Sequence, residues 1–429
     1  MSTLRSLMPP KPSHPPRARR RGGLPTRGEP RVRRGTVRVS ADVATRIRSG
    51  HPYLFRDALG GRPLQASAGD LVELVDPAGD FVAKGLFDPI GAIAVRVVSR
   101  NPDGVFDSET IARRVESARR LRELMLPADG SDCYRIVHSE GDGIPGVTVD
   151  RYGEHLVVHL YSSAIERSRD ALYDALEKTW KPRAIYEQRR FRPQTGEGPR
   201  EPATLARGEL APVELEVNEG GVKFVVDVTA PLGSGLFLDL REGRKSIANL
   251  AAGRRFLNLF SYTGAFSVYG AKAGAREIVS VDVAPKAHAR ARRNLQANGL
   301  DEAKHEFIAG DAFKVLAKMA ERKRQFDLIV LDPPSFGQSK ERGVFSVQKD
   351  YRELVEGCLA VAAPGALIAA VSNTLKISAE EIDRAIGDAA ARSRRQVRVV
   401  ERRGLPADFP VPAGFLEGHY LKFFLCAVA

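Results

Sequence analysis

The chain has 429 residues, of which 43% are hydrophobic and 28% are charged, and its formal net charge at pH 7 is +13. This length predicts two to four folding units, and the composition excludes a fibrous or wholly disordered protein. No apolar run approaches the roughly 18 residues that a membrane-spanning helix needs, and the first residues lack the apolar core of a signal peptide. We therefore expect a cytoplasmic protein with no membrane partner.

The number and spacing of the cysteines limit which disulfides and metal sites the chain could form. The chain has three cysteines, Cys133, Cys358 and Cys426, with no CxxC pair and no histidine cluster at metal-ligand spacing. We predict neither a disulfide framework nor a metal site, which suits a reducing compartment.

The positive charge is concentrated at the start of the chain. Residues 1–34 contain ten basic side chains and one acidic residue, Glu29, together with many prolines. Proline removes backbone donors, and the stretch has little apolar periodicity, so we predict that residues 1–36 form a disordered basic tail. The tail is either a solubilising extension or an electrostatic arm for RNA, because neutralised phosphates release counterions. The sequence leaves both roles open.

Short strands separated by turn residues are predicted in residues 37–105. Apolar residues alternate with polar ones, and Asp-Pro and Gly-Asp pairs separate the runs, which predicts a small β-barrel. A basic and aromatic segment precedes these runs. Aromatic rings beside cations suit unpaired RNA bases. The candidate RNA-binding residues in this segment are Arg46, Arg48, His51, Tyr53 and Arg56, although each also fits a barrel core or a solvated face.

Residues 106–230 mix strands and helices. Apolar spacing of three and four predicts helices over 107–126 and roughly 165–179. The glycines of 141–146 lie between two predicted strands, which favours a hairpin turn over a phosphate cradle. We predict a loop over 191–208, with Arg189 and Arg190 beside it as further RNA-binding candidates, and a hairpin turn at Gly220-Gly221. These elements predict an α+β connector domain.

Strands alternate with helices in residues 231–429. Such alternation predicts a doubly wound, mainly parallel sheet, in which ligands bind beyond the carboxyl ends of the strands. Candidate ligand-binding residues lie at the ends of four successive predicted strands. They are Ser261, Tyr262, Thr263 and Gly264 after the first, Asp282 at the end of the second, Asp311 and Ala312 after the third, and Asp332, Pro333, Pro334, Ser335 and Phe336 after the fourth.

This series predicts a nucleoside-containing cofactor. Asp282 suits the two hydroxyls of a ribose, and Asp311 suits the amino group of an adenine. The first turn lacks GxGxxG, which a pyrophosphate requires, so S-adenosylmethionine is favoured over a dinucleotide. Asp332 and the two prolines would present acceptors to a planar nitrogenous substrate, with Phe336 stacking on its ring. Taken singly, Ser261, Asp282 and Asp311 also fit helix N-caps, and Asp-Pro-Pro fits a turn.

From about residue 37 to the end, the sequence resembles the bacterial class I large-subunit ribosomal RNA methyltransferases. The resemblance rests on the segments 235–241 (GLFLDLR), 258–264 (NLFSYTG), 280–282 (SVD) and 331–336 (LDPPSF). It implies a PUA-like RNA-binding domain (37–105), a connector (106–230) and a Rossmann-like methyltransferase domain (231–429). It also implies S-adenosylmethionine as cofactor and ribosomal RNA as partner. The cofactor residues that it adds to those above are Phe237, Asp239, Arg241, Asn258 and Phe260.

The target base is decided by chemistry. Carbon 5 of cytosine becomes nucleophilic only after a thiolate adds to the ring, whereas a guanine nitrogen needs no covalent step. In relatives that thiol follows the strand-four prolines or ends strand five, and here Ser335 and Asn373 stand at those places. We therefore predict direct transfer to guanine N7 or N2 of 23S rRNA, with Asp332, Pro333, Pro334, Phe336 and Asn373 as catalytic residues.

Other functions stay open at this point. Cytosine-5 methylation is the alternative within the same family, and a non-catalytic RNA-binding assembly factor or a small-molecule or protein methyltransferase is an alternative of another class. Tight cofactor binding would argue against the assembly factor, and turnover without RNA would indicate the last. The sequence does not fix the oligomeric state, for which a homodimer is one option.

Overall fold

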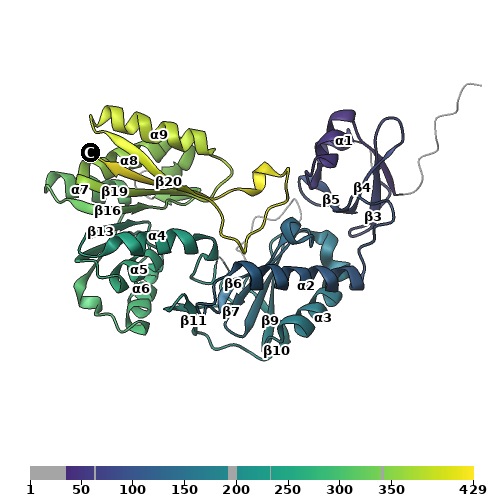
Figure 1. Cartoon of the computed structure of the whole chain (residues 1–429), viewed down its shortest axis with the longest axis horizontal. Helices are drawn as coiled ribbons and strands as arrows, with labels where there is room; N and C mark the ends of the chain where they lie inside the picture. Colours follow the sequence, from purple (N-terminus) through teal and green to yellow (C-terminus); the bar gives the residue numbers. More distant parts are fainter. Residues whose placement is uncertain (1–34, 62–63, 192–200, 232, 340–342) are drawn as a thin grey trace, which may run out of the picture. The chain divides into compact units, whose positions relative to one another are not determined.

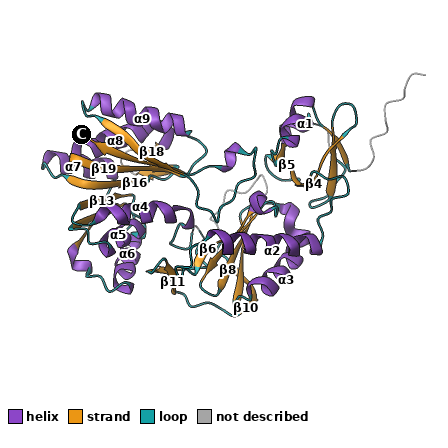
Figure 2. Cartoon of the chain, in the orientation of Figure 1, coloured by secondary structure: helices purple, strands orange, loops and turns teal. Residues whose placement is uncertain are grey.

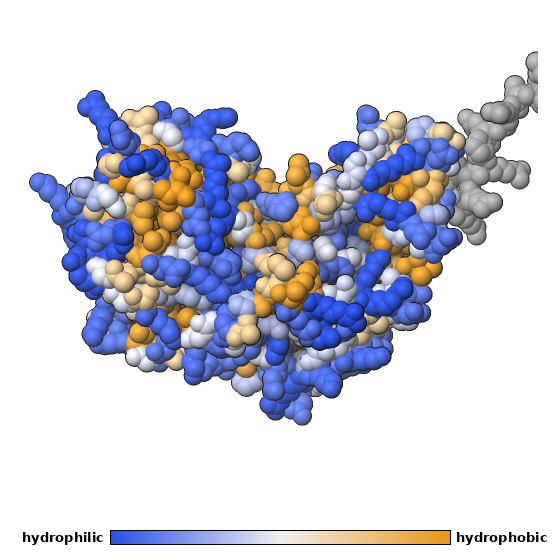
Figure 3. All heavy atoms as spheres, viewed as in Figure 1, coloured by the Kyte–Doolittle hydropathy of each residue, from blue (hydrophilic) through white to orange (hydrophobic). Residues whose placement is uncertain are grey.

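The computed structural model describes residues 35–61, 64–191, 201–231, 233–339 and 343–429, and for residues 336–339 and 343–345 it describes the backbone alone. The predicted basic tail lies outside the described residues except for its last two positions, and so does the side chain of Phe336. Hydrophilic residues cover most of the face seen in Figure 3. In the described part of the chain, no helix is long and apolar enough to cross a membrane.

The first described unit is a five-stranded sheet with one helix (Figure 1). Its elements are β1 (Thr36–Arg38), α1 (Ala41–Arg48), β2 (Tyr53–Phe55), η1 (Arg56–Leu59), β3 (Leu71–Val75), β4 (Phe81–Phe87) and β5 (Ile93–Ser99), with the strand order β1-β3-β4-β5-β2. The Ser40 side chain accepts from the backbone N–H of Val43 and caps α1. Alternate strand residues such as Leu54, Leu74 and Val95 are buried in one core, as the sequence pattern predicts.

The connector is a five-stranded sheet covered by two helices. Its elements are α2 (Ser108–Met125), β6 (Cys133–His138), η2 (Ser139–Asp142), β7 (Val147–Tyr152), β8 (His155–Leu160), η3 (Ser163–Ser168), α3 (Arg169–Trp180), β9 (Ala184–Arg189) and β10 (Thr204–Gly208), in the strand order β10-β9-β8-β7-β6. The glycines of 141–146 connect the antiparallel strands β6 and β7, so the predicted turn between strands is confirmed.

The predicted loop over 191–208 is partly wrong. Thr204–Gly208 forms the edge strand β10, which pairs antiparallel with β9 and shifts register between Leu205 and Arg207. The backbone groups along the outer side of β9 need partners, and β10 supplies them although its own sequence lacks a clear strand pattern. Residues 192–200 lie outside the described part.

A β-hairpin leads into the last domain. It consists of β11 (Leu215–Glu219) and β12 (Val222–Val226), which pair antiparallel. Gly220 and Gly221 at its tip have φ values of 58° and 80°. Two successive residues at positive φ define the tight turn whose twist matches a hairpin, so the predicted turn is confirmed.

The last domain is a seven-stranded sheet between two layers of helices (Figure 2). The strands are β13 (Arg255–Leu259), β14 (Glu277–Asp282), β15 (His305–Ala309), β16 (Phe326–Leu331), β19 (Ala362–Ser372), β20 (Val397–Arg403) and β21 (Lys422–Val428). Their order is β15-β14-β13-β16-β19-β21-β20, and only β21 runs antiparallel to its two neighbours. The predicted doubly wound, mainly parallel sheet is confirmed.

Helices cover both faces of this sheet (Figure 1). One face packs against α7 (Ala312–Glu321), α8 (Val347–Val361) and α9 (Ala379–Arg392). The other carries α4 (Arg241–Ala251), α5 (Ala265–Lys272) and α6 (Pro285–Ala297). Shorter elements are η4 (Leu238–Leu240), η5 (Glu302–Lys304), η6 (Leu416–Gly418) and the hairpin of β17 (Phe336–Ser339) and β18 (Gly343–Ser346). The chain reverses its direction of travel across the sheet between β13 and β16, where a ligand crevice is expected.

Candidate active site

A cavity of about 560 Å³ lies at the carboxyl ends of the parallel strands. This volume falls in the range of about 300–1,000 Å³ that is typical of ligand sites. We call it the cofactor cavity. Residues that follow β13, β14, β15, β16 and β19 line it, together with residues before and within α4: Gly235, Phe237, Leu240, Arg244, Phe260, Ser261, Tyr262, Thr263, Ala265, Phe266, Asp282, Val283, Asp311, Phe313, Asp332, Pro333, Pro334, Ser335 and Asn373.

The turn after β13 adopts an unusual backbone conformation. Phe260 and Tyr262 have φ values of 57° and 48°, a left-handed region that bulky residues rarely enter. Gly264 is also left-handed, and a Cβ there would lie 2.8 Å from the Cβ of Ala291 in α6. Glycine is therefore required for the close approach of α5 to α6. Strained turns of this kind are typical of functional sites, where the surrounding fold maintains them.

Asp282 supports this turn from the end of β14. Its carboxylate accepts from the backbone N–H of Tyr262 at 2.8 Å and of Ala284 at 2.9 Å. A carboxylate has about four acceptor positions, so these two bonds leave capacity for the hydroxyls of a ribose. Asp282 therefore both lines the cavity and holds the turn after β13 in place.

Asp311 is a helix N-cap that also lies at the cavity, so its predicted contact with an adenine stays a prediction. It is the N-cap of α7, accepting from the backbone N–H of Phe313 at 3.0 Å and of Lys314 at 3.3 Å, and it also lines the cofactor cavity. Ser261 provides a different sign of a ligand. Ser261 lines the same cavity, and its buried Oγ has no hydrogen-bond partner among the described residues. Because an unsatisfied buried hydroxyl is costly, a polar ligand atom would complete it.

Asp332 lies where β16 ends and has a strongly perturbed acidity. Burial and the nearby Asp239 carboxylate raise its pKa to about 7, while Arg244 opposes the shift. Its side chain still reaches the cavity, beside Pro333, Pro334 and Asn373. Raised carboxyl pKa values in a cleft are typical of catalytic positions.

Five of the predicted cofactor residues do not line the cofactor cavity. They are Gly264, which shapes the turn after β13, and Asp239, Arg241, Asn258 and Ala312. Arg241 is buried in an ion pair with Asp408 and does not line the cavity. The Asn258 side chain donates to Ser267 Oγ at 2.9 Å inside the core, and Ala312 is the first residue of α7 and is buried in the core. The predicted contacts of these last three side chains with the cofactor are therefore corrected to structural roles.

Arg244 is a charged cavity residue that sequence reasoning missed, and Gly235, Leu240, Ala265, Phe266, Val283 and Phe313 are further lining residues that were not predicted as site residues. Arg244 lies one helical turn after Arg241 on α4, and its guanidinium pairs with both carboxylate oxygens of Glu219 at 2.7 and 2.6 Å. It also donates to the backbone oxygen of Phe237 at 2.8 Å. Positions three apart share a helix face, so the sequence offered no signal to choose between the two arginines.

Asp239 lies beside rather than inside the cofactor cavity. Its carboxylate accepts from the hydroxyl of Tyr420 at 2.9 Å, and burial raises its pKa. It lines a neighbouring cavity, which also includes Phe237 and Tyr262.

The predicted RNA-binding residues divide into exposed and structural ones. Arg46 is exposed on α1, and Arg48 pairs with Asp76 at 3.0 Å. His51 is buried, with its ring 5.5 Å from that of Phe415, and half-buried Tyr53 lies 5.2 Å below the Arg96 guanidinium.

The remaining predicted RNA-binding arginines have protein partners as well. Arg56 donates to the backbone oxygens of Asp88 and Gly91 at 2.6 Å, and Arg189 pairs with Glu166 and Glu187. Arg190 donates to the backbone oxygen of Pro231 at 3.2 Å. Buried His51 thus follows the structural alternative, while the contact of the other residues with RNA, Arg56 included, stays a prediction.

Comparison with known proteins agrees with this geometry. Residues 135–419 match the family model of the S-adenosylmethionine-dependent methyltransferases, and residues 37–100 match that of the PUA-like domain. Ribosomal RNA large subunit methyltransferase I of Photobacterium profundum is 33% identical over 386 residues, which cover 89% of this chain and 96% of the relative. The protein of the same name from Escherichia coli is 34% identical over 378 residues, covering 88% and 95% of the two chains.

A solved structure extends the likeness to three dimensions. SMU.776, described as a methyltransferase and crystallised in complex with SAH, superimposes with a TM-score of 0.83 at 26% identity, over 91% of this chain and 99% of that chain. The fold, the cavity at the strand ends and the sequence matches agree. The chain therefore belongs to the family of S-adenosylmethionine-dependent methyltransferases in which a PUA-like domain accompanies the catalytic domain, the family of the large-subunit ribosomal RNA methyltransferases.

Proposed function

We propose that this enzyme methylates large-subunit ribosomal RNA, the 23S rRNA, and that it transfers the methyl group directly to a guanine nitrogen, N7 or N2. The names of the curated relatives support ribosomal RNA as the substrate. The choice of atom rests on the residues of the cofactor cavity.

The position of the cysteines carries this proposal. All three are buried and none lines the cofactor cavity: Cys133 lies in β6, Cys358 in α8 and Cys426 in β21. Burial raises the pKa of each thiol, that of Cys426 to about 12. A buried thiol with a raised pKa is a poor nucleophile. At the strand ends, where a thiolate would have to attack a cytosine, the cavity presents Ser335 and Asn373.

The polar groups of the cavity suit a guanine nitrogen. When bound, S-adenosylmethionine supplies the electrophilic methyl group. The Asp332 carboxylate and the Asn373 amide offer acceptors that would hold a planar base by its edge, so that its lone pair points at the methyl carbon. With a pKa of about 7, Asp332 is also able to take the proton that an exocyclic amine releases after transfer. Methylation at N7 releases no proton, so there Asp332 would only orient the base.

Product analysis together with variant kinetics tests the proposal. Nucleosides from 23S rRNA treated with the enzyme should contain a methylated guanine by mass spectrometry. Asp332→Ala should lower kcat on the order of a hundredfold while leaving cofactor affinity largely intact, because it removes a positioned polar group.

Replacement of the cysteines tests the alternative of cytosine-5 methylation, which requires a nucleophilic thiolate. Replacing all three by serine or alanine should leave kcat within a few-fold, with circular dichroism confirming that the fold survives. Detection of 5-methylcytosine, a covalent complex with 5-fluorocytosine RNA, or loss of turnover from one cysteine replacement in a folded protein would overturn the guanine proposal.

A further inference from the structure

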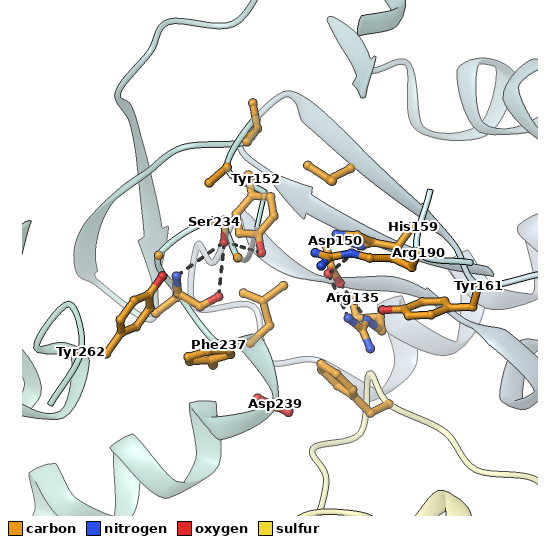
Figure 4. Close-up of a pocket in the computed structure, with 18 residues that line it drawn as sticks. Arg135, Asp150, Tyr152, His159, Tyr161, Arg190, Ser234, Phe237, Asp239 and Tyr262 are labelled. Atoms are coloured by element: carbon orange, nitrogen blue, oxygen red, sulfur yellow. Dashed lines mark hydrogen bonds and ion pairs between the residues drawn. The ribbon is translucent and has the colours of Figure 1, made fainter. Parts of the chain in front are cut away.

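A second cavity of about 170 Å³ lies beside the cofactor cavity. Figure 4 shows the residues that line it. Gly235, Phe237 and Tyr262 line both cavities. The connector supplies the opposite side, with Arg135, Asp150, His159, Tyr161 and Arg190 among its lining residues. In Figure 4 these connector side chains face Phe237 and Tyr262 across the cavity.

The charged groups of this cavity have partners within the protein. Arg135 binds both oxygens of Asp150, with its Nε at 2.8 Å and its Nη2 at 2.9 Å. Asp239 accepts from Tyr420, and burial lowers the pKa of His159 to about 4, so that its ring is neutral at pH 7. A phosphate site needs uncompensated cations or oriented donors. These paired groups therefore favour a neutral polar ligand.

Two aromatic rings are the most exposed parts of the lining. Tyr161 and Phe237 keep 44% and 45% of their surface exposed, which is high for large hydrophobic residues beside a cavity. Exposed rings next to polar groups suit a flat ligand with an apolar face and a polar edge, as a nucleobase has. The volume is below the range of about 300–1,000 Å³ for complete small-molecule ligands, so the cavity would hold one such group.

We propose that the second cavity binds one unpaired base of the RNA substrate, adjacent to the nucleotide that enters the cofactor cavity. Tyr161 and Phe237 provide stacking surfaces, and the paired polar groups behind them contact the edge of the base. The shared wall places the two bases side by side, as consecutive nucleotides of a splayed strand would lie. This inference rests on the proposed function only in taking RNA as the substrate, and it holds for either acceptor base.

A thermodynamic cycle that combines protein variants with altered RNAs tests the proposal. The full chain, with S-adenosylhomocysteine present, is titrated with a ribosomal RNA fragment that contains the mapped methylation site, and with copies that carry an abasic nucleotide at either flanking position or at the acceptor position. For the wild-type protein, one abasic flanking position should weaken binding about tenfold, since a stacked base is lost. Tyr161→Ala should weaken binding of the intact RNA by a similar factor and show no further loss with that abasic RNA.

Matched variants separate stacking from other effects. Tyr161→Phe keeps the ring and should bind intact RNA within twofold of the wild type. Leu210→Ala removes an exposed apolar side chain elsewhere on the connector and should retain the full abasic penalty. Cofactor affinity, measured by calorimetry, should be unchanged in all three variants, which excludes unfolding as the cause.

The proposal has clear contrary results. If the losses from Tyr161→Ala and from each abasic position multiply independently, the cavity does not hold a flanking base. If Tyr161 couples instead to the acceptor nucleotide, the cavity belongs to the acceptor and the proposal of a second base is overturned. Failure of the wild type to methylate intact ribosomal RNA would be a separate result, and it would contradict the proposed function.

Discussion

The cofactor cavity and the second cavity share a wall, but their polar side chains come from different kinds of positions. In the cofactor cavity, Asp282, Asp311 and Asp332 each lie at or just after the end of a parallel strand, and the Ser261 hydroxyl has no partner in the part of the chain that the structure describes. In the second cavity, Arg135 and Asp150 lie on neighbouring antiparallel strands and satisfy each other. One site is built by the topology of the sheet, and the other by pairing between side chains.

This difference has an energetic consequence. Polar groups that await a ligand contribute to binding more than to folding, whereas groups that pair inside the protein contribute to folding and preorganise a surface. We therefore expect substitutions at the two cavities to affect different measurements. The predictions below test that separation, beginning with the largest effect.

Removal of the Asp150 carboxylate should mainly destabilise the connector. Asp150→Ala leaves the largely buried Arg135 guanidinium without its bidentate partner, which should lower the free energy of unfolding by about 3 kcal/mol. Urea denaturation measures this change. Asp150→Asn keeps one acceptor and should cost less. Cofactor affinity of the folded variants should be unaltered, and a stability loss below about 1 kcal/mol for Asp150→Ala would contradict the structural role.

Removal of the Asp282 carboxylate should mainly weaken cofactor binding, in addition to removing the two hydrogen bonds that it accepts from the backbone of Tyr262 and Ala284. Asp282→Ala removes an acceptor for two ribose hydroxyls, so affinity for S-adenosylmethionine should fall by about 2–4 kcal/mol. Calorimetry measures the affinity directly. Asp301→Ala is the matched control, because Asp301 is exposed and caps only the short η5. Unchanged affinity in Asp282→Ala would refute the assignment.

Ionisation of Asp332 should give the enzyme a pH dependence near neutrality. Its pKa is raised to about 7 in the folded protein, so the orienting and proton-accepting carboxylate forms as pH rises through that value. The kcat/KM of the wild type should increase across this range. The Asp332→Asn variant should have a low kcat/KM that does not rise with pH in this range.

The same ionisation links Asp332 to stability. Between about pH 4 and 7, the folded protein binds more protons at this site than the unfolded chain, so the free energy of unfolding should fall as pH rises through this window. Asp332→Asn should lack that contribution. A wild-type kcat/KM that does not vary between pH 6 and 8 would contradict a catalytic role for the carboxylate.

The sequence predicted the residues at the strand ends of the cofactor cavity, because the ends of strands in a parallel sheet can be recognised from the order of apolar and polar residues. Asp282, Asp311 and Asp332 each follow a run of apolar residues, and the fold brings such positions together. Arg241 and Arg244 show the limit of this reasoning. Both lie on the first two turns of α4, and only the packing of Asp408 and Glu219 against that helix decides which guanidinium faces the cavity.

The second cavity could not be predicted from the sequence, because its lining residues lie far apart along the chain. Its lining residues come from β6, β7, β8, the positions just after β8, β9 and β13, the segment 228–239 and the loop that contains Phe409. Arg190 was predicted as an RNA contact from its charge alone, but no sequence pattern joins Tyr161 to Phe237. Long-range pairing of this kind depends on tertiary packing rather than on local periodicity. The strand β10 escaped prediction for the same reason, since β9 supplies its register.

The basic tail should contribute the smallest effect on specificity and a measurable one on affinity. Deletion of residues 1–34, which stops before β1, removes nine net positive charges. RNA binding should weaken to the same extent for cognate and unrelated RNA, because phosphate contacts carry no sequence information. The dependence of log K on log salt concentration should also flatten, since fewer counterions are released on binding. Titrations at several salt concentrations measure both quantities. An unaltered salt slope would show that the tail does not contact the RNA, and a loss confined to cognate RNA would assign it a role in recognition that neither cavity supplies.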